Sequence, residues 1–277
     1  MVKAAGTNFA YAELGSGSPL LLLSGTGSPM SEWDPALLAQ LKKSHRVLVF
    51  DYPGLGQSGP APAKWSFPRA ADWISQFLDS VIPNTPVDVL GWSMGGFIAQ
   101  QLAIRHPARV RKLVLAGTNP GGARTELGPP WVQRIDSDAD SSDQDYLKTN
   151  YPATASAQFA GRAFLHRLET AVSSGVYPVS KVPSATYEAM VNAEDSWIRS
   201  DANYRALPGL THPTLVMTGT RDVVTPPANS RLIAHTIPQA ELSLLPGAGH
   251  SFLFQNPKRT ARAVDEFLHG QIGLQGS

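Results

Sequence analysis

The stretch VDVLGWSMGG, residues 87–96, decides the fold of this chain. An apolar run turns at Gly91-Trp92-Ser93-Met94-Gly95, which matches the pattern G-x-S-x-G, and a segment with helical periodicity follows at once. In a strand-to-helix turn of this kind, small residues two positions on either side of the serine leave room for a strained backbone that projects the hydroxyl. The stretch therefore predicts a nucleophilic Ser93 at the end of a buried strand. An incidental serine in a glycine-rich turn is the alternative.

Short apolar runs bounded by Gly, Pro or polar residues recur along the chain and predict strands of a parallel sheet that are buried on both faces. These runs are 20–23, 47–50, 87–90, 112–117, 214–219 and 240–245. Segments with one apolar stripe at helical spacing lie between or after them, at 69–82, 94–105 and 258–269. The alternation predicts an α/β fold with a mostly parallel sheet and helices on both faces.

The segment 120–208 breaks this alternation, because no apolar run in it resembles a buried strand. It is too long for a loop in a compact domain, and 151–172 and 182–200 have the pattern of helices. We expect residues 1–119 and 209–277 to form the core of the fold. Residues 120–208 are expected to form a helical cap, or lid, over the carboxyl ends of the strands, where open α/β sheets bind ligands.

Composition excludes several classes of function. The chain has 277 residues, a net charge of +1 and no cysteine, so we expect no nucleic-acid partner, no disulfide and no thiolate metal site. The N-terminal residues lack the apolar region of a signal peptide, and no apolar run approaches the ~20 residues of a membrane span. These features predict a cytoplasmic protein with a small-molecule substrate. The oligomeric state is not indicated.

A serine nucleophile needs a base, and the base needs an orienting acid. Asp222 follows the predicted strand 214–219, and His250 lies in a glycine-rich loop after the predicted strand 240–245. We therefore expect Ser93, Asp222 and His250 to form a catalytic triad. Five other histidines next to element ends or prolines are expected to have surface or capping roles: His45, His106, His212, His235 and His269.

Two further patterns resemble ligand-binding motifs but lack residues that these motifs require. Asp136, Asp138 and Asp140 fit the start of a calcium-binding loop, yet Ser141 replaces the required glycine and Leu147 the required glutamate, so a solvated, helix-capping loop is expected. Gly25 and Gly27 begin a dinucleotide fingerprint that Met30 interrupts. We expect no metal and no cofactor.

The sequence resembles the α/β-hydrolase family, in particular its small esterases, lactonases and cofactor-free haloperoxidases. The resemblance covers nearly the whole chain and is strongest at 20–58, 87–119 and 212–268. The order Ser93, Asp222, His250 is the order of this family. FDYPGLGQS, residues 50–58, resembles the family turn D-x-x-G-x-G-x-S, in which Asp51 would be structural.

The resemblance implies an ester or lactone hydrolase that works through an acyl-enzyme, with an oxyanion hole made of two backbone N–H groups. One belongs to Met94, and the other to Thr26 in Ser24-Gly25-Thr26, where the family usually has His-Gly-x. Whether the Thr26 hydroxyl also donates stays open. Residues expected to bind substrate are Trp92, Gly25 and Trp131. Phe159, Phe164, Tyr187 and Trp197 are explained equally well by a pocket and by packing within the cap.

Other activities of the fold remain open. Dehalogenases and epoxide hydrolases of this family have an aspartate at the position of Ser93, so the sequence disfavours them. Perhydrolases of the cofactor-free haloperoxidase type and carbon–carbon bond hydrolases use the same triad. A receptor-like member that binds its ligand without turnover is the alternative from another class.

Overall fold

A seven-stranded sheet forms the centre of the molecule in the computed structural model, which describes residues 1–180 and 182–270. Its order is β3-β5-β4-β6-β7-β8-β9, in which β3 pairs antiparallel with β5 and all other neighbours are parallel. The strands are β3 (Tyr11–Leu14), β4 (Ser18–Leu23), β5 (His45–Phe50), β6 (Val87–Trp92), β7 (Val110–Ala116), β8 (Thr214–Gly219) and β9 (Ala240–Leu245). The predicted α/β class is confirmed.

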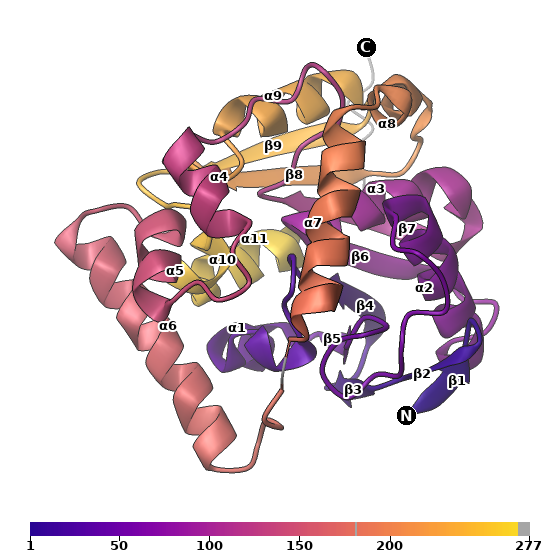
Figure 1. Ribbon diagram of the computed structural model, residues 1–277. Coiled ribbons are helices and arrows are strands. Elements are labelled where there is room, and N and C mark those ends of the chain that lie inside the picture. The colour runs from indigo at the N-terminus through magenta and orange to yellow at the C-terminus, as the bar shows by residue number, and fades with distance from the viewer. Residues whose placement is uncertain (181, 271–277) are drawn as a thin grey trace.

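Helices cover both faces of this sheet, as the alternation predicts (Figure 1). Leu21 and Leu23 of β4 pack in one apolar cluster with α2 (Phe67–Val81) and α3 (Met94–Arg105). Leu20 and Leu22 pack in the other with α1 (Pro35–Leu41) and α11 (Pro257–His269). The four consecutive leucines thus alternate between two cores, because successive side chains of a strand point to opposite faces. The remaining helices that flank the sheet are α9 (Pro227–Thr236), α10 (Phe252–Gln255) and the 3-10 turns η1 (Met30–Glu32) and η2 (Pro107–Arg109).

Two expectations about strands were wrong or incomplete. The edge strand β9 is not buried on both faces, since Leu242 is 38% exposed and Glu241 is also exposed. The first residues form strands that the apolar-run criterion missed: a hairpin of β1 (Val2–Ala4) and β2 (Thr7–Phe9), followed by β3. These strands have only three or four residues each, so none contains a continuous apolar run.

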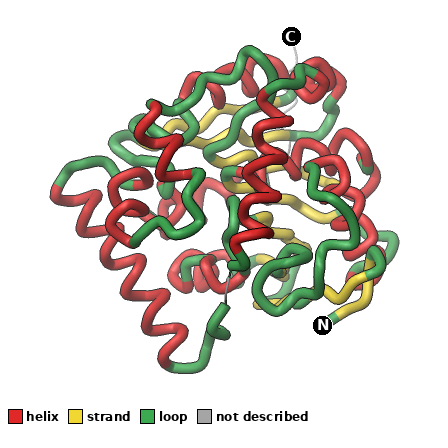
Figure 2. The backbone as a smooth tube through the Cα atoms, in the orientation of Figure 1, coloured by secondary structure: helices red, strands yellow, loops and turns green. Residues whose placement is uncertain are grey.

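Between β7 and β8 the chain is helical in its described residues. Its helices are α4 (Pro130–Asp136), α5 (Asp143–Asn150), α6 (Ala155–Ser173), α7 (Ser184–Ile198), α8 (Ala202–Ala206) and η3 (Leu207–Gly209). Figure 1 shows α7 crossing in front of the strands while α4, α5 and α6 lie to one side, and Figure 2 shows the loops that join them in green. The absence of a strand among the described residues of this segment agrees with the expected helical insertion. The boundaries 1–119, 120–208 and 209–277 stay a prediction.

Candidate active site

The turn from β6 into α3 holds Ser93 in a strained backbone conformation, with φ 55° and ψ −123°. A side chain at such a positive φ costs free energy and persists only where the surroundings impose it. Here the surroundings require glycine on both sides of the serine. A Cβ atom at Gly91 would lie 2.4 Å from the Gly95 carbonyl oxygen, and one at Gly95 would lie 2.0 Å from that of Leu23. Close packing of α3 on β4 and β6 therefore explains the G-x-S-x-G spacing.

Asp222 and His250 form a buried pair. The His250 Nδ1 atom lies 2.8 Å from Asp222 Oδ2, and each residue is 3% exposed. The other carboxylate oxygen, Oδ1, accepts hydrogen bonds from the backbone N–H groups of Val224 and Thr225, each at 2.9 Å. The Thr225 hydroxyl donates to Oδ2 at 3.0 Å. Because the Asp222 carboxylate is held from several sides, it fixes the orientation of the His250 ring.

Burial and the neighbouring charges shift the pKa of His250 in opposite directions. Burial lowers its pKa, but the nearby carboxylates of Asp222, Asp136 and Glu194 outweigh this effect and raise the pKa above its ordinary value. Trp92 contacts the same histidine. Its Nε1–H donates to the His250 carbonyl oxygen at 3.2 Å, and the centres of the two rings lie 5.5 Å apart. The surroundings of the imidazole thus favour its protonated form.

The loop after β4 bends back next to Ser93. The Ser24 hydroxyl donates to the Ser28 carbonyl oxygen at 2.7 Å and closes this loop, which is the anchoring role available to a serine where the family usually has histidine. Gly25 lies against the Trp92 ring and the Ser93 side chain. Gly27 has a φ of +67°, a conformation that favours glycine. The resulting turn places Thr26 on the same cavity as Ser93.

Two backbone N–H groups of this region are outside the regular hydrogen bonds of helices, strands and loops among the described residues. The Thr26 N–H donates to no acceptor among the residues that the structure describes. Met94 is the first residue of α3, so the helix offers its N–H no carbonyl four residues earlier. The N-terminus of a helix also favours negative charge. Both groups are suited to stabilise an oxyanion.

The Thr26 side chain has a partner that sequence reasoning missed. Its hydroxyl donates to Glu194 Oε1 on α7, and the neighbouring Gly27 N–H donates to the Met190 sulfur at 3.4 Å. Burial and the nearby Asp136 carboxylate raise the pKa of Glu194 to about 8. No local pattern marks Glu194, because the two partners are 168 residues apart in the sequence.

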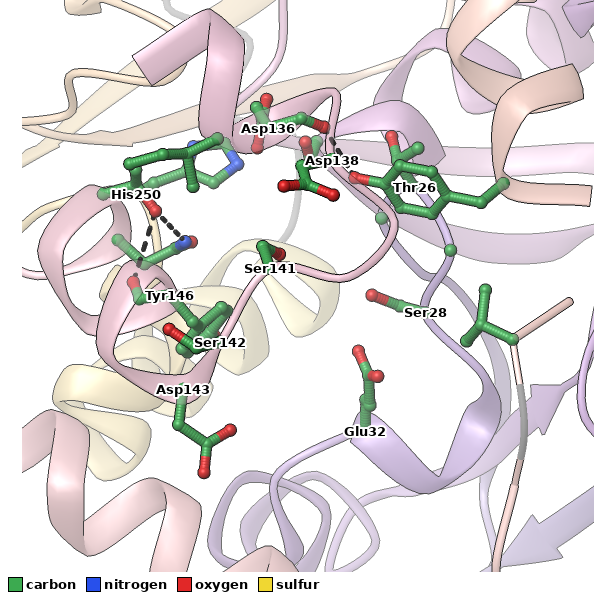
Figure 3. A pocket seen from close by; sticks show the side chains of 18 of the residues that line it. Thr26, Ser28, Glu32, Asp136, Asp138, Ser141, Ser142, Asp143, Tyr146 and His250 are labelled. Carbon is green, nitrogen blue, oxygen red and sulfur yellow. Dashed lines mark hydrogen bonds between the residues drawn. The ribbon is translucent and has the colours of Figure 1, made fainter. Parts of the chain in front are cut away.

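A cavity of about 320 Å³ joins these parts, and its lining includes Ser93, His250, Gly25, Thr26 and Trp92. This volume lies at the lower end of the range for small-molecule sites. Figure 3 shows His250 and Thr26 on its upper side and Tyr146 and Glu32 lower in the view. Sequence segments before β5 and after β6, β7 and β9 therefore meet at one place.

Not every residue expected near substrate lies there. Phe164 and Tyr187 line the cavity, but Trp131 does not, and the Lys148 ammonium lies 4.9 Å from the centre of its ring. Trp131 thus lies outside the lining of this cavity, and its role in substrate binding stays a prediction. Phe159 is 70% exposed and Trp197 packs in the core against Phe97.

The expectation for one histidine away from the cavity also needs correction. His45 is completely buried rather than at the surface, and its Nε2 atom lies 3.1 Å from Asp265 Oδ1. With His269 these residues form the one group of three potential metal ligands that the described residues contain. Asp265 Oδ1 lies 3.1 Å from a ring nitrogen of each histidine. Because burial lowers the pKa of His45 and favours its neutral form, hydrogen bonds to Asp265 account for the cluster.

Asp51, for which the resemblance implies a structural role, lies outside the lining of the cavity. Its carboxylate accepts hydrogen bonds from the backbone N–H groups of Met30 and Gln57, each at 2.7 Å. It thereby ties the turn 51–58 to the loop that carries Thr26.

The family model described as alpha/beta hydrolase fold matches residues 18–257. The pimeloyl-[acyl-carrier protein] methyl ester esterase of Chromobacterium violaceum is 30% identical, over 95% of this chain and 99% of that protein. The 2-hydroxymuconate semialdehyde hydrolase of a Pseudomonas species is 29% identical, over 96% and 92%. A solved alpha/beta hydrolase fold protein from Chitinophaga pinensis superposes with a TM-score of 0.86 at 24% identity, covering 98% of this chain and 96% of that one.

Coverage differs for one further relative. The polyketide synthase ThaQ of Burkholderia thailandensis is 31% identical over 92% of this chain, which spans 12% of that protein.

Within residues 1–180 and 182–270, no helix has the length and apolar character needed to cross a membrane.

Proposed function

The chain belongs to the alpha/beta hydrolase fold family, and on that premise we propose that it cleaves an ester or lactone through a covalent acyl-enzyme. The observation that carries the proposal is the buried His250–Asp222 pair, 2.8 Å between Nδ1 and Oδ2, on the same cavity as the strained Ser93. A nucleophile, a base and an orienting acid are the three groups that acyl transfer requires.

In the proposed reaction, His250 takes the proton of the Ser93 hydroxyl as its oxygen attacks the substrate carbonyl. Asp222 holds the imidazole in the tautomer that has its proton on Nδ1 and stabilises the charged ring. The N–H groups of Thr26 and Met94 donate to the oxyanion that forms. His250 then gives its proton to the leaving alcohol and activates a water molecule, which releases the acid and regenerates Ser93.

The contacts of Thr26 support donation from its backbone. Its hydroxyl donates to Glu194, so the hydroxyl hydrogen already has an acceptor within the protein. The N–H has no protein acceptor among the described residues. We therefore assign the N–H, and not the hydroxyl, to the oxyanion hole.

The test compares the wild-type protein with Ser93→Ala on p-nitrophenyl acetate and butyrate and on a panel of lactones. Circular dichroism of both proteins checks that the variant folds. We expect hydrolysis by the wild type and its loss in the variant, together with stoichiometric labelling of Ser93 by a fluorophosphonate. Hydrolysis retained by a folded Ser93→Ala protein would refute the mechanism. Labelling of the wild type without turnover on any member of the panel would favour the receptor-like alternative.

A further inference from the structure

The aspartate-rich run 136–145 lies against the catalytic cavity. Its capping role is present: Ser142 and Asp145 form a reciprocal capping box at the start of α5. Three other members, Asp136, Asp138 and Asp143, line the cavity that also contains Ser93 and His250. The run is therefore more than a solvated surface loop, since part of it forms a wall of the site.

A fourth carboxylate reaches the cavity from another part of the chain. Glu32, in η1, lines it as well. Figure 3 shows Glu32 below and Asp138 above the same space, with their carboxylates directed into it. No lysine or arginine is among the described lining residues, and none of these four carboxylates forms an ion pair with a described lysine or arginine.

The environment of two of these groups disfavours their negative charge, because no described lysine or arginine offsets the effect of burial. Burial raises the pKa of Glu32 to about 7, and only a hydrogen bond from Ser28 opposes this effect. Although part of the Asp136 side chain is open to solvent, the protein around it desolvates the carboxylate and raises its pKa. Like charges in a cleft of low dielectric destabilise one another and focus their field on the space between them.

A single metal ion does not account for this arrangement. Among the described residues, the only group of three or more potential ligands whose donor atoms lie within 4.8 Å of one another is His45, Asp265 and His269, away from the cavity. The carboxylates of the cavity are instead spread around its walls. An organic cation that extends from the reacting carbonyl would meet these carboxylates within the same cavity.

We propose that the substrate of this site carries a positive charge, on an ammonium or guanidinium group in its acyl part, which Glu32 and Asp138 attract while Ser93 attacks the carbonyl. The inference rests on the proposed function, because it assigns a substrate class to the same nucleophile. An anionic acyl group of the same length is disfavoured by the same carboxylates.

The experiment compares two p-nitrophenyl esters of equal shape: 4-(trimethylammonio)butyrate and its neutral isostere 5,5-dimethylhexanoate. Each kcat/KM is divided by the rate of hydroxide-catalysed hydrolysis of that ester, which removes the difference in intrinsic reactivity. At low salt we expect the corrected kcat/KM to be about tenfold higher for the cation. We expect this preference to shrink at ~0.5 M salt, since ions in solution screen the long-range attraction between the cation and the carboxylates. The monoester of glutarate, an anion, should be the poorest substrate of the three.

Single-residue variants test which carboxylates produce the preference for the cationic ester. Asp138→Asn and Glu32→Gln should each lower the ratio of cation to neutral ester about threefold. Asp140→Asn is the matched control, because Asp140 belongs to the same acidic run but does not line the cavity; its ratio should equal that of the wild type. Circular dichroism checks the fold of each variant.

Two outcomes would overturn the inference. One is a wild-type ratio at or below unity while hydrolysis still depends on Ser93, which leaves the proposed function intact. The other is an equal loss in Asp140→Asn and Asp138→Asn, which would assign the preference to the overall charge of the loop. Loss of all hydrolysis in the wild type is a different result, and it would contradict the proposed function itself.

Discussion

The hydroxyl of Thr26, in the loop after β4, donates a hydrogen bond to Glu194 Oε1 of α7. The same helix contacts the next residue of the loop, since a Cβ atom at Gly27 would lie 2.5 Å from the Tyr187 ring. Helix α7 thus fixes the turn that presents the Thr26 N–H. We infer that the position of this proposed oxyanion donor depends on a helix inserted between β7 and β8.

The first prediction concerns the Thr26–Glu194 contact. Thr26→Val removes the hydroxyl donor and keeps the backbone N–H, so we expect kcat to fall about tenfold, less than the 10²–10³-fold known for loss of a whole oxyanion donor. Glu194→Gln keeps an acceptor oxygen, so it should lower kcat less than Thr26→Val does. In a double-mutant cycle the variant Thr26→Val/Glu194→Gln should lose little more kcat than Thr26→Val alone, because Thr26→Val has already removed the hydrogen bond that Glu194→Gln weakens. Losses that multiply would mean that the two residues act independently.

The second prediction concerns the pH dependence. His250 must be neutral to act as a base, so kcat/KM falls as the pH drops through the pKa of His250, which lies above its ordinary value. The Asp136 carboxylate helps to raise this pKa. Asp136→Asn should therefore move the acid limb of the pH profile, measured on a neutral p-nitrophenyl ester, to lower pH. Asp140→Asn serves as the control, and an acid limb that stays in place in Asp136→Asn would contradict the assigned interaction.

The third prediction concerns the support of Asp222. Thr225→Val removes the hydroxyl that donates to Asp222 Oδ2 but leaves both backbone donors to Oδ1. We expect kcat to fall about tenfold with little change in KM, because the change affects the orientation of His250 and not a surface that contacts substrate. Thr225→Ser keeps the hydroxyl and should restore most of the rate. Steady-state kinetics of both variants on one ester measures the difference, and equal rates would show that the hydroxyl is dispensable.

The fourth prediction concerns the glycines of the serine turn. A Cβ atom at Gly95 would lie 2.0 Å from the Leu23 carbonyl oxygen, whereas one at Gly209 would meet nothing within 4 Å. Overpacking of a core costs about 1–3 kcal/mol, and occasionally more, so Gly95→Ala should lower the free energy of unfolding by at least about 2 kcal/mol. Gly209→Ala should change it by less than about 0.5 kcal/mol. Urea denaturation measures both; similar values would show that α3 can shift to accept the methyl group.

Much of the scaffold follows from local sequence. The predicted strand 214–219 and the predicted helix 94–105 have the observed bounds of β8 and α3. A buried parallel strand must be a continuous apolar run and an amphipathic helix must show one stripe, so each can be identified from a few residues. The same rule fails for β1, β2 and β3, which are too short to show such a run.

The sequence by itself determined the strand-to-helix turn at Ser93, the order of Ser93, Asp222 and His250, and the glycines around them. Each of these is a local requirement of backbone geometry or of chemistry at a strand end. Only the tertiary structure decided that Glu194 pairs with Thr26, that Glu32 and the run 136–145 face one cavity, and that Trp131 lies outside it. The physical reason is that these contacts join segments separated by up to 168 residues. Their approach depends on how the inserted helices pack on the sheet, which no short stretch of the chain specifies.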